Sequence, residues 1–502
     1  METSGKIVIA ADIGTTSTKA LAVDLSGRIL GSHSIGYSLN TPQSGHAEQD
    51  PEAMLSAVVD SVSAVMRKGG WLAEDVLCVS FSSAAHSLIA VNGEGRALTP
   101  VITWADLRSE RQAQRLKQDG SGLANYLRTG TPIHPMTPLV KLIWMREERP
   151  ALFAEARYFV GIKEYILQRL FGGDYVTEYS MASGTGLFHL ASLGWDPQAL
   201  RLAGIREEQL PRLLPTTGRL TGLKREYVER MGLSPNTPFV LGAQDGVLAN
   251  LGIGAVRDGV AAVTIGTSSA VRTAVASPAL DPHGRLFCYA LTDRHWIVGG
   301  PSNNGAVAVQ WMAERVFRGR PMEEVLPLAG EVPPGADGLF FLPLLSGERA
   351  PFWNGQAKGV LFGLTLAHDE RHMMRAAMEG VVYQIAAIVS MMNDSGGQAK
   401  EIRASGGFAR SELWCQMLAD VLGVPVQVPE SVESSGLGAA QLGLYAMEDG
   451  RGALLRWDAG NGRCYEPDSR AYAVYRELLP FYLNIYDRLK DTMREADDLK
   501  RG

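Results

Sequence analysis

The sequence predicts a mixed α/β fold built from two related halves, and three observations lead to this prediction. The chain has 502 residues, 46% of them hydrophobic and 20% charged, which is ordinary globular composition and enough for two large domains or about three smaller ones. Apolar runs typical of strands alternate with segments typical of helices, as mixed α/β architecture requires. A short motif also recurs about half a chain apart, between strand-like runs in both places.

The N-terminal segment predicts a β-hairpin followed by a helix. Apolar residues at 7–11 and 20–23 flank a polar turn that contains glycine, which is the pattern of two strands and their connection. Asp50-Pro51-Glu52 then predicts a helix start, with a capping Asp, Pro at the first helical position and an acid in the first turn. Apolar residues recur at three- and four-residue spacing up to Met66, so we expect this helix to bury one face. A strand is expected next, from Val76 to Phe81.

The recurring motif is a turn rich in Gly, Thr and Ser. Residues 13–17 (Ile-Gly-Thr-Thr-Ser) are matched by residues 265–269 (Ile-Gly-Thr-Ser-Ser). Such turns direct several N–H and hydroxyl groups into one concavity, which binds anions and phosphate above all. For either copy alone an ordinary hairpin turn is the favoured interpretation, but the two copies together favour nucleotide binding by two lobes that hold a polyphosphate from both sides. A boundary is predicted at 254–259, which has a glycine at each end.

The common phosphate-binding motifs are absent from the sequence. Gly5-Lys6 is followed by Ile7 rather than Ser or Thr, and no GxxxxGK[ST] occurs elsewhere. Residues 252–257 (Gly-Ile-Gly-Ala-Val-Arg) lack the third glycine of the dinucleotide-binding fingerprint. The sequence therefore argues against both the P-loop and the Rossmann folds.

Two aspartates, Asp12 and Asp245, are candidates for metal binding and for general-base catalysis. Asp12 precedes the first turn at a strand end, where it would hold Mg²⁺ beside bound phosphates or bond its own turn. Asp245 lies among small residues between the apolar runs 239–241 and 247–249. A carboxylate in such a place is expected to have raised proton affinity, as a general base requires, or to cap a helix. Both alternatives stay open for each residue.

Composition excludes several other classes of protein. The formal net charge of −6 provides no basic field, so neither nucleic acid nor an anionic membrane is an expected partner. The four cysteines show no CxxC spacing, which argues against a disulfide framework or a zinc site and suits a reducing compartment. The N-terminus does not have the make-up of a signal peptide, and no apolar stretch approaches the ~20 residues that span a bilayer. We therefore expect a soluble, cytoplasmic protein.

Over nearly its full length the chain resembles the FGGY carbohydrate kinases. Residues 136–145 (Met-Thr-Pro-Leu-Val-Lys-Leu-Ile-Trp-Met) are similar to the family's first signature, and residues 359–364 with 372–379 are similar to its second. The residues alone predict a helix with an apolar stripe, and a strand followed by a buried helix. The resemblance implies the two-lobed, duplicated fold of actin and hexokinase, which is ribonuclease H-like, with a cleft between the lobes. It divides the chain into a sugar-binding N-terminal domain at 1–254 and a nucleotide-binding C-terminal domain at 255–502.

The resemblance also assigns ATP, Mg²⁺ and their contacts. Asp245 falls on the catalytic base, and Asp12 and Asp245 are the expected metal-binding residues. The expected nucleotide-binding residues are Asp12, Gly14, Thr15, Thr16, Lys19, Gly266, Thr267, Ser268, Gly406, Gly407 and Ser411. The last three lie in the segment 405–411, which resembles the adenosine-binding segment and equally predicts a strand-to-helix turn that Ser411 caps. The loop 299–305 resembles another part of the nucleotide cleft.

The sugar contacts are expected mostly from the first half of the chain. They are Ser83, His86, Trp104, Asp106 and Lys163. The sequence departs from the family pattern at four positions: Ala85 and Ser87 replace Met and Gly, Leu107 replaces a frequent Asn, and Glu178 replaces a more usual Asp. A serine after His86 is more similar to the gluconokinase members of the family than to the xylulokinase members.

The expected reaction follows from this resemblance. It is ATP-dependent transfer of the γ-phosphoryl group to a hydroxyl of a sugar acid, D-gluconate giving 6-phospho-D-gluconate. The carboxylate of gluconate calls for a cation or several N–H donors; Lys163 is the first candidate, followed by Lys141 and Arg108. A homodimer is a family expectation only.

Other functions remain as alternatives. The nearest is a xylulokinase or another pentulose or polyol kinase. A non-catalytic, nucleotide-dependent scaffold or sensor is less favoured, because it needs neither Asp245 nor the pair Trp104 and Asp106. A DNA-binding sugar sensor would need a basic helix-turn-helix extension, which the sequence does not contain.

Overall fold

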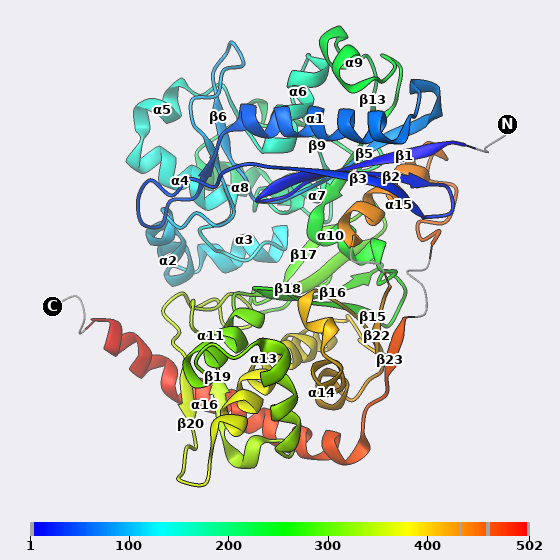
Figure 1. Cartoon of the computed structure of the whole chain (residues 1–502). Helices are drawn as coiled ribbons and strands as arrows, with labels where there is room; N and C mark the ends of the chain where they lie inside the picture. The colour runs from blue at the N-terminus through cyan, green and yellow to red at the C-terminus, as the bar shows by residue number, and fades with distance from the viewer. Residues whose placement is uncertain (1–4, 431–432, 458–461, 499–502) are drawn as a thin grey trace. The chain divides into compact units, whose positions relative to one another are not determined.

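The computed structural model describes residues 5–430, 433–457 and 462–498. The chain packs as two compact units (Figure 1). The first comprises Met1–Gly254, Ala276–Ile297 and Glu433–Asp458, and the second comprises Ala255–Val275, Val298–Val432 and Ala459–Gly502. Two segments of the C-terminal half thus pack with the N-terminal half. The division into a sugar-binding domain at 1–254 and a nucleotide-binding domain at 255–502 concerns function rather than packing, and it stays a prediction.

A six-stranded mixed sheet forms the centre of the first unit. Its strands lie in the order β13 (Arg219–Leu220), β14 (Phe239–Gln244), β5 (Val76–Ser83), β1 (Ile7–Ile13), β2 (Ser17–Asp24) and β3 (Ile29–Gly36). β1, β5 and β14 are parallel neighbours, whereas β2 and β3 run antiparallel to the strands beside them. The predicted hairpin is confirmed, and its pairing extends to Ile13 and Thr18 at the turn.

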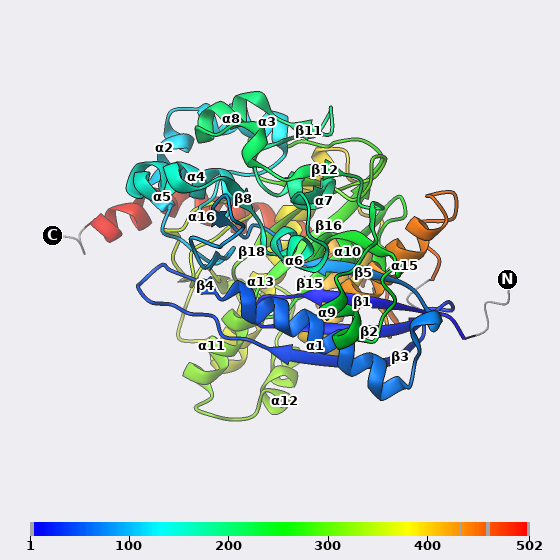
Figure 2. The same cartoon turned by 90° about the horizontal axis from the view of Figure 1, so that it is seen from above.

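The first helix covers one face of this sheet as predicted. α1 (Pro51–Gly69) begins after Asp50, whose carboxylate accepts a hydrogen bond from the Glu52 N–H at 2.9 Å. Its apolar stripe, which includes Val58 and Val62, is buried in one cluster with strand residues such as Ile9. Figures 1 and 2 both show α1 beside β2 and β3. The predicted strand at 76–81 is β5, which continues to Ser83.

The other face of the sheet is covered by two helices that also pack against each other. They are α10 (Asp245–Gly252), which follows β14 directly, and α15 (Ser434–Met447) from the C-terminal half of the chain. The rest of the unit is an addition of short strand pairs and helices. The pairs are β4 (Glu48–Gln49) with β7 (Val101–Ile102), β6 (Ile89–Val91) with β8 (Tyr158–Val160), β9 (Val176–Glu178) with β12 (Arg212–Leu214), and β10 (Phe188–His189) with β11 (Gly194–Trp195).

The remaining elements of the first unit are these: β17 (Phe287–Ala290), α2 (Glu110–Gln118), α3 (Ser121–Thr129), α4 (Pro138–Glu148), α5 (Pro150–Glu155), α6 (Ile162–Phe171), α7 (Tyr179–Ser183), α8 (Pro197–Ala203), α9 (Arg225–Met231), and the 3₁₀ turns η1 (Ala73–Asp75) and η2 (Glu207–Gln209).

The second unit repeats the strand pattern of the first. Its strands lie in the order β18 (Trp296–Ser302), β16 (Ser269–Val275), β15 (Val260–Ile265), β21 (Glu401–Ser405), β22 (Val426–Val428) and β23 (Arg463–Tyr465). An antiparallel hairpin, β15 and β16, is followed on one side by two parallel strands and an antiparallel edge strand. This is the arrangement of β1 and β2 with β5, β14 and β13, and the motif at 13–17 and 265–269 forms the hairpin turn in both units. The structure therefore confirms the predicted duplication.

Helices and short elements complete the second unit. They are α11 (Ala306–Val316), α12 (Met322–Val325), α13 (Glu370–Asp394), α14 (Glu412–Leu422), α16 (Ser469–Asp498), the strand pair β19 (Phe340–Leu342) and β20 (Val360–Phe362), and the 3₁₀ turns η3 (Leu326–Glu331), η4 (Ala336–Gly338) and η5 (Gly407–Arg410). Across the described residues of both units, no helix is long and apolar enough to cross a membrane.

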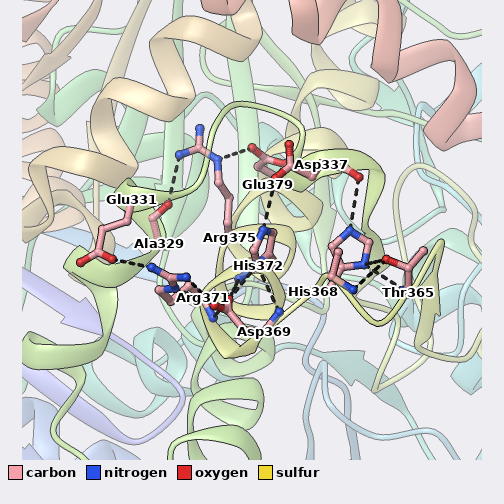
Figure 3. A network of polar contacts seen from close by, with 11 residues as sticks. Ala329, Glu331, Asp337, Thr365, His368, Asp369, Arg371, His372, Arg375 and Glu379 are labelled. Atoms are coloured by element: carbon pink, nitrogen blue, oxygen red, sulfur yellow. Dashed lines mark hydrogen bonds and ion pairs between the residues drawn. The ribbon is translucent and has the colours of Figure 1, made fainter.

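Polar residues of the second signature support the start of α13 (Figure 3). Asp369 caps the helix and accepts from the Arg371 N–H at 3.0 Å, and its carboxylate lies 2.7 Å from Nδ1 of His372. The buried Glu379 accepts hydrogen bonds from Nε of Arg375 and from the Gly335 N–H, while burial raises the pKa of its carboxyl group. These residues hold the start of the helix in place, and the strand followed by a buried helix that the sequence predicts is β20 followed by α13.

Gly242 provides a test of how β14 packs on β5. Its φ is 75°, and a Cβ atom there would lie 1.6 Å from the Phe81 carbonyl oxygen. Gly242→Ala should therefore lower the free energy of unfolding in urea. The steric clash should add about 3 kcal/mol to the loss caused by an alanine at positive φ. Gly232→Ala is the matched control, since Gly232 has φ of 71° and no atom within 4 Å of a built Cβ; it should cost only about 1 kcal/mol. Equal losses in the two variants would contradict this account of the β5–β14 contact.

Candidate active site

Three parallel strands of the first unit end at the same edge of the sheet. Ile13 at the end of β1 pairs with Ser83 at the end of β5, and Ser83 pairs with Gln244 at the end of β14. In α/β folds, ligands bind outside the carboxyl ends of parallel strands. The chain beyond each strand carries a predicted site residue, namely Thr15, His86 and Asp245. The structure thus brings together residues that are 70 or more positions apart in the sequence.

Asp12 lies near the end of β1 and is half-buried. Its Oδ2 accepts a hydrogen bond from the Ser435 hydroxyl at 2.7 Å, whereas its Oδ1 is buried without a hydrogen-bond partner among the described residues. A buried carboxylate oxygen without a partner is costly, and a hard cation or its bound water would satisfy it. Mg²⁺ in phosphoryl transfer usually takes only one or two carboxylates and completes its shell with water and phosphates. Asp12 therefore fits such an ion, although the described residues contain no cluster of three or more His, Cys, Asp or Glu side chains.

The first Gly-Thr-Thr turn is held by side chains around it. The Tyr37 hydroxyl donates to the Gly14 carbonyl at 2.6 Å, and Nε2 of Gln49 donates to the Thr15 carbonyl at 2.5 Å. Nε1 of Trp104 donates to Oγ1 of Thr15 at 2.9 Å, which links the predicted sugar side to the turn. Lys19 forms an ion pair with Glu433 at 2.9 Å, so a phosphate bound by Lys19 competes with that carboxylate.

Asp245 is the first residue of α10 and follows β14 without a connecting loop. Its side chain is half-buried, and Oδ1 accepts a hydrogen bond from the Gly246 N–H at 2.6 Å. A carboxylate at a helix N-terminus is stabilised by the helix dipole. The position is thus consistent with a contact to the helix start and with a base at the strand edge, the two alternatives that the sequence leaves open.

The second unit has the same arrangement of strand ends. β15 and β21 are parallel and paired from Val260 with Glu401 to Thr264 with Ser405, so the turn 266–268 and the segment 406–411 leave the sheet at one edge. A Cβ on Gly406 would lie 2.4 Å from the Ile265 carbonyl oxygen, which only glycine permits at that φ of 101°. Ser411 caps α14 as predicted, accepting from the Trp414 N–H at 3.3 Å.

The loop 299–305 is attached directly to the second turn. The Gly305 N–H donates to the Thr267 carbonyl at 3.0 Å, and the Ala306 N–H donates to the Gly266 carbonyl at 2.7 Å. The two predicted nucleotide segments at 266–268 and 299–305 therefore form one structure, and any change in the loop reaches the turn.

Glu348 holds this loop, and sequence reasoning missed it. Its carboxylate is fully buried and accepts four hydrogen bonds, from the N–H groups of Asn303 and Arg349, the Ser302 hydroxyl and the Asn304 amide, at 2.6–3.1 Å. Burial raises the pKa of Glu348 to about 7, although the donors lower it. The available signal was a single acid, followed by Arg349, in a largely small and apolar stretch before Pro351, which is weak evidence without its partners.

The expected sugar contacts differ in how they are placed. Ser83 is buried at the end of β5. His86 has a φ of 66°, which is unusual for a residue other than glycine and typical of strained functional positions. Its Nδ1 lies 2.7 Å from the Gly184 carbonyl oxygen, and its ring is edge-on to Tyr289. Together with Trp104, His86 lies beside the strand edge described above.

Asp106 and Arg108 form an ion pair. Asp106 is fully buried, and its carboxylate accepts hydrogen bonds from Nε and Nη2 of Arg108 and from the Ala47 N–H. Arg108 also pairs with Glu48 at 2.5 Å. Both carboxylate oxygens of Asp106 are therefore used within the protein, and a direct bond from Asp106 to a sugar hydroxyl stays a prediction.

Lys163 is likewise not exposed to a substrate. Its ammonium is fully buried, lies 2.5 Å from Oε1 of Glu178 and donates to the Leu241 carbonyl at 3.0 Å. Glu178, the departure noted in the sequence, is thus the partner of Lys163, and burial raises its pKa. Lys141 is fully buried as well. Lys163, Lys141 and Arg108 all bind protein groups, and the expectation that one of these cations meets a substrate carboxylate stays a prediction.

Comparison with known proteins identifies the family. The model of the FGGY family of carbohydrate kinases matches residues 7–252 with its N-terminal domain and residues 261–447 with its C-terminal domain. The chain belongs to this family. It is therefore a carbohydrate kinase, as the sequence predicts, and kinases of this family use ATP.

Individual relatives cover almost the whole chain. A gluconokinase of Bacillus subtilis (strain 168) is 43% identical over 99% of this chain and 98% of its own length, and a xylulose kinase of the same organism is 26% identical over 97% and 98%. Among solved structures, a ligand-bound xylulose kinase of Lactobacillus acidophilus has a TM-score of 0.94 and 34% identity, over 98% of this chain and 99% of that one. A gluconate kinase of the same species has a TM-score of 0.93 and 35% identity, over 96% and 98%. These similarities confirm the predicted fold class.

The Lys163–Glu178 pair allows a structural role to be separated from a substrate contact. Lys163→Met leaves a buried carboxylate without its partner and should lower the free energy of unfolding by about 3–5 kcal/mol. The double variant Lys163→Met, Glu178→Gln removes both charges but keeps an oxygen for the Ser180 and Met181 N–H groups that Glu178 caps, so it should regain most of that loss in urea denaturation. A single variant with unchanged stability and weakened sugar binding would instead place Lys163 against the substrate.

Glu348 makes stability depend on pH in a defined direction. Folding raises its pKa from 4.5 to about 7, so the folded protein binds this proton more tightly than the unfolded chain does. The resulting stabilisation is complete below pH 4.5 and is lost as the pH rises through 7. Relative to Glu348→Gln, the wild type should lose about 3 kcal/mol of unfolding free energy between pH 4.5 and 8. Urea titrations at several pH values measure this difference, and a difference that does not change with pH would contradict the assignment.

Proposed function

We propose that this carbohydrate kinase transfers the γ-phosphoryl group of ATP to D-gluconate and forms 6-phospho-D-gluconate. The similarity to gluconokinases over almost the full length carries this proposal. Two gluconokinases are 42–43% identical to the chain, whereas the xylulose kinases of Bacillus subtilis and Lactococcus lactis are 26% and 25% identical. Xylulose phosphorylation is the alternative, and the ligand-bound xylulose kinase with a TM-score of 0.94 favours it.

Asp245 is the proposed base. Its carboxylate would accept the proton of the attacking hydroxyl as that oxygen attacks the γ-phosphorus in line with the leaving oxygen. Its position at the end of β14 supports this role, because the edge that it shares with His86 and Thr15 is where a ligand of this sheet is expected. Asp245 is half-buried, so part of the residue is exposed.

The two Gly-Thr turns are the proposed phosphate-binding elements. In the first unit Gly14, Thr15, Thr16 and Lys19 serve this role, and in the second unit Gly266, Thr267 and Ser268 do. Gly406, Gly407 and Ser411 would contact the adenosine. Asp12 and Asp245 are the proposed Mg²⁺ ligands, and the bound ion would neutralise charge on the phosphates. The buried Oδ1 of Asp12 supports this assignment.

The proposed direct sugar contacts are fewer than those expected from the sequence. Ser83, His86 and Trp104 remain as direct contacts, while Asp106 and Lys163 act through Arg108 and Glu178. Recognition of the gluconate carboxylate would then come from His86 and N–H donors at the strand edge. We also propose that the reaction takes place in the cytoplasm, which the four free cysteine thiols support.

A substrate panel tests the proposed reaction. ADP release is coupled to an indicator reaction and measured with gluconate, xylulose, ribulose, glycerol and fuculose. The largest kcat/KM is expected with gluconate. A tenfold preference for xylulose would support the alternative, and ATP turnover that needs no sugar would indicate a sensor or scaffold.

Replacement of Asp245 tests the base. Asp245→Asn should reduce kcat by at least about 100-fold, while the dissociation constant for ATP changes little. Asp258→Asn, at an exposed position of the neighbouring segment, is the control and should keep wild-type kinetics. Near-normal turnover of Asp245→Asn would show that another group accepts the proton.

A further inference from the structure

The ammonium of Lys141 is enclosed by backbone carbonyl groups. Lys141 lies on α4, within the first signature, and is fully buried. Its Nζ donates to the carbonyl oxygens of His86 at 2.6 Å, Thr103 at 2.7 Å and Ile102 at 3.3 Å. An ammonium has three N–H donors and no acceptor, so these three bonds use its full capacity and leave none for a ligand.

These carbonyls belong to two segments that are distant in the sequence. His86 lies beyond β5, whereas Ile102 is the last residue of β7 and is followed by Thr103, which directly precedes Trp104. The two segments carry His86 and Trp104, two of the proposed sugar contacts. Water is excluded from the buried ammonium. Without this ammonium the His86 and Thr103 carbonyl oxygens would lose these hydrogen bonds, whereas the Ile102 carbonyl would keep the bond from the Leu88 N–H at 3.0 Å.

The strained backbone of His86 shows why a hydrogen bond to its carbonyl is needed. Its φ of 66° persists only where surrounding contacts hold the residue. The bond from Lys141 fixes its carbonyl, and the contact between Nδ1 and the Gly184 carbonyl fixes its ring. Charge-assisted hydrogen bonds are stronger than neutral ones. The bond from Lys141 to the His86 carbonyl is therefore expected to be stronger than the contact between the His86 ring and the Gly184 carbonyl.

The restraint reaches the first turn through Trp104. Thr103, which Lys141 holds, is the residue before Trp104, and Trp104 donates to the Thr15 side chain at 2.9 Å. The backbone of the turn has separate supports, because Tyr37 and Gln49 bond the carbonyls of Gly14 and Thr15. Loss of Lys141 is therefore expected to disturb Trp104 more than the turn itself.

We propose that Lys141 is a positioning residue that clamps the His86 and Trp104 segments together, so that both side chains meet the sugar in one fixed geometry. Lys141 does not touch the substrate. The effect on sugar binding rests on the proposed function, but the clamp itself is a property of the protein without ligand. Burial lowers the pKa of Lys141 to about 7, while the nearby Asp106 raises it and Arg108 lowers it further.

Lys141→Met tests the clamp, because methionine keeps an unbranched side chain and removes the charge. The KM for gluconate should rise at least tenfold, and the dissociation constant for ATP without sugar should change less than twofold. The indole N–H resonance of Trp104, assigned with Trp104→Phe, should shift in the ligand-free protein. Lys224→Met is the matched control: Lys224 is exposed, and its ammonium also donates to a backbone carbonyl, that of Arg169 at 2.7 Å. It should leave all three quantities unchanged.

The outcomes separate the clamp from its rivals. A higher KM with an unmoved Trp104 resonance would mean that Lys141 contacts the substrate, and wild-type values throughout would mean that it only fills space; either result overturns the proposal. If wild-type protein does not phosphorylate gluconate, the proposed function fails while the resonance still decides the clamp.

A second variant covers the case in which Lys141→Met does not fold. Lys141→Ala leaves a cavity that propylammonium fits, and this ion should restore the Trp104 resonance to its wild-type position. Propan-1-ol at the same concentration, which has the same length but no charge, should not. Restoration by both compounds, or by neither, overturns the clamp.

Discussion

The parallel alignment of β1, β5 and β14 is the constraint on which the candidate active site depends. Because Ile13, Ser83 and Gln244 pair at the same level, the chain leaves all three strands at one edge, and Thr15, His86 and Asp245 follow within a few residues. A shift of one residue in either pairing would turn the strand side chains to the opposite face and would displace the segments that carry these three residues. The second unit uses the same constraint, since β15 and β21 end together and bring the turn 266–268 beside the segment 406–411.

Charged groups behind this edge are satisfied within the protein. Lys163 binds Glu178, Arg108 binds Asp106 and Glu48, and Lys141 binds three carbonyls. Buried charges are stable only when they are paired and hydrogen-bonded, and here each of them holds a segment that carries a proposed contact. On the proposed function, the buried ions would set positions, and His86, Trp104 and Asp245 would be the groups that meet ligands.

Local features of the fold were predictable from the sequence, and long-range ones were not. The hairpin, the cap at Asp50 and the repeated turn depend on neighbouring residues, and the structure confirms them. The burial of Asp106 and Lys163 depends on partners such as Glu48, 58 positions before Asp106, so residue type alone made them resemble ligand contacts. Glu348 was missed for the same reason, because its four donors include a loop 44–46 residues before it. The roles of Asp12, Asp245 and the two turns stay predictions.

A crystal structure of the protein with gluconate and a non-hydrolysable ATP analogue tests the central claim most directly. The account predicts gluconate at the carboxyl ends of β1, β5 and β14, with one hydroxyl within hydrogen-bond distance of the Asp245 carboxylate and the carbon chain against Trp104. Gluconate bound elsewhere, with Asp245 in contact with neither the sugar nor the metal, would contradict it.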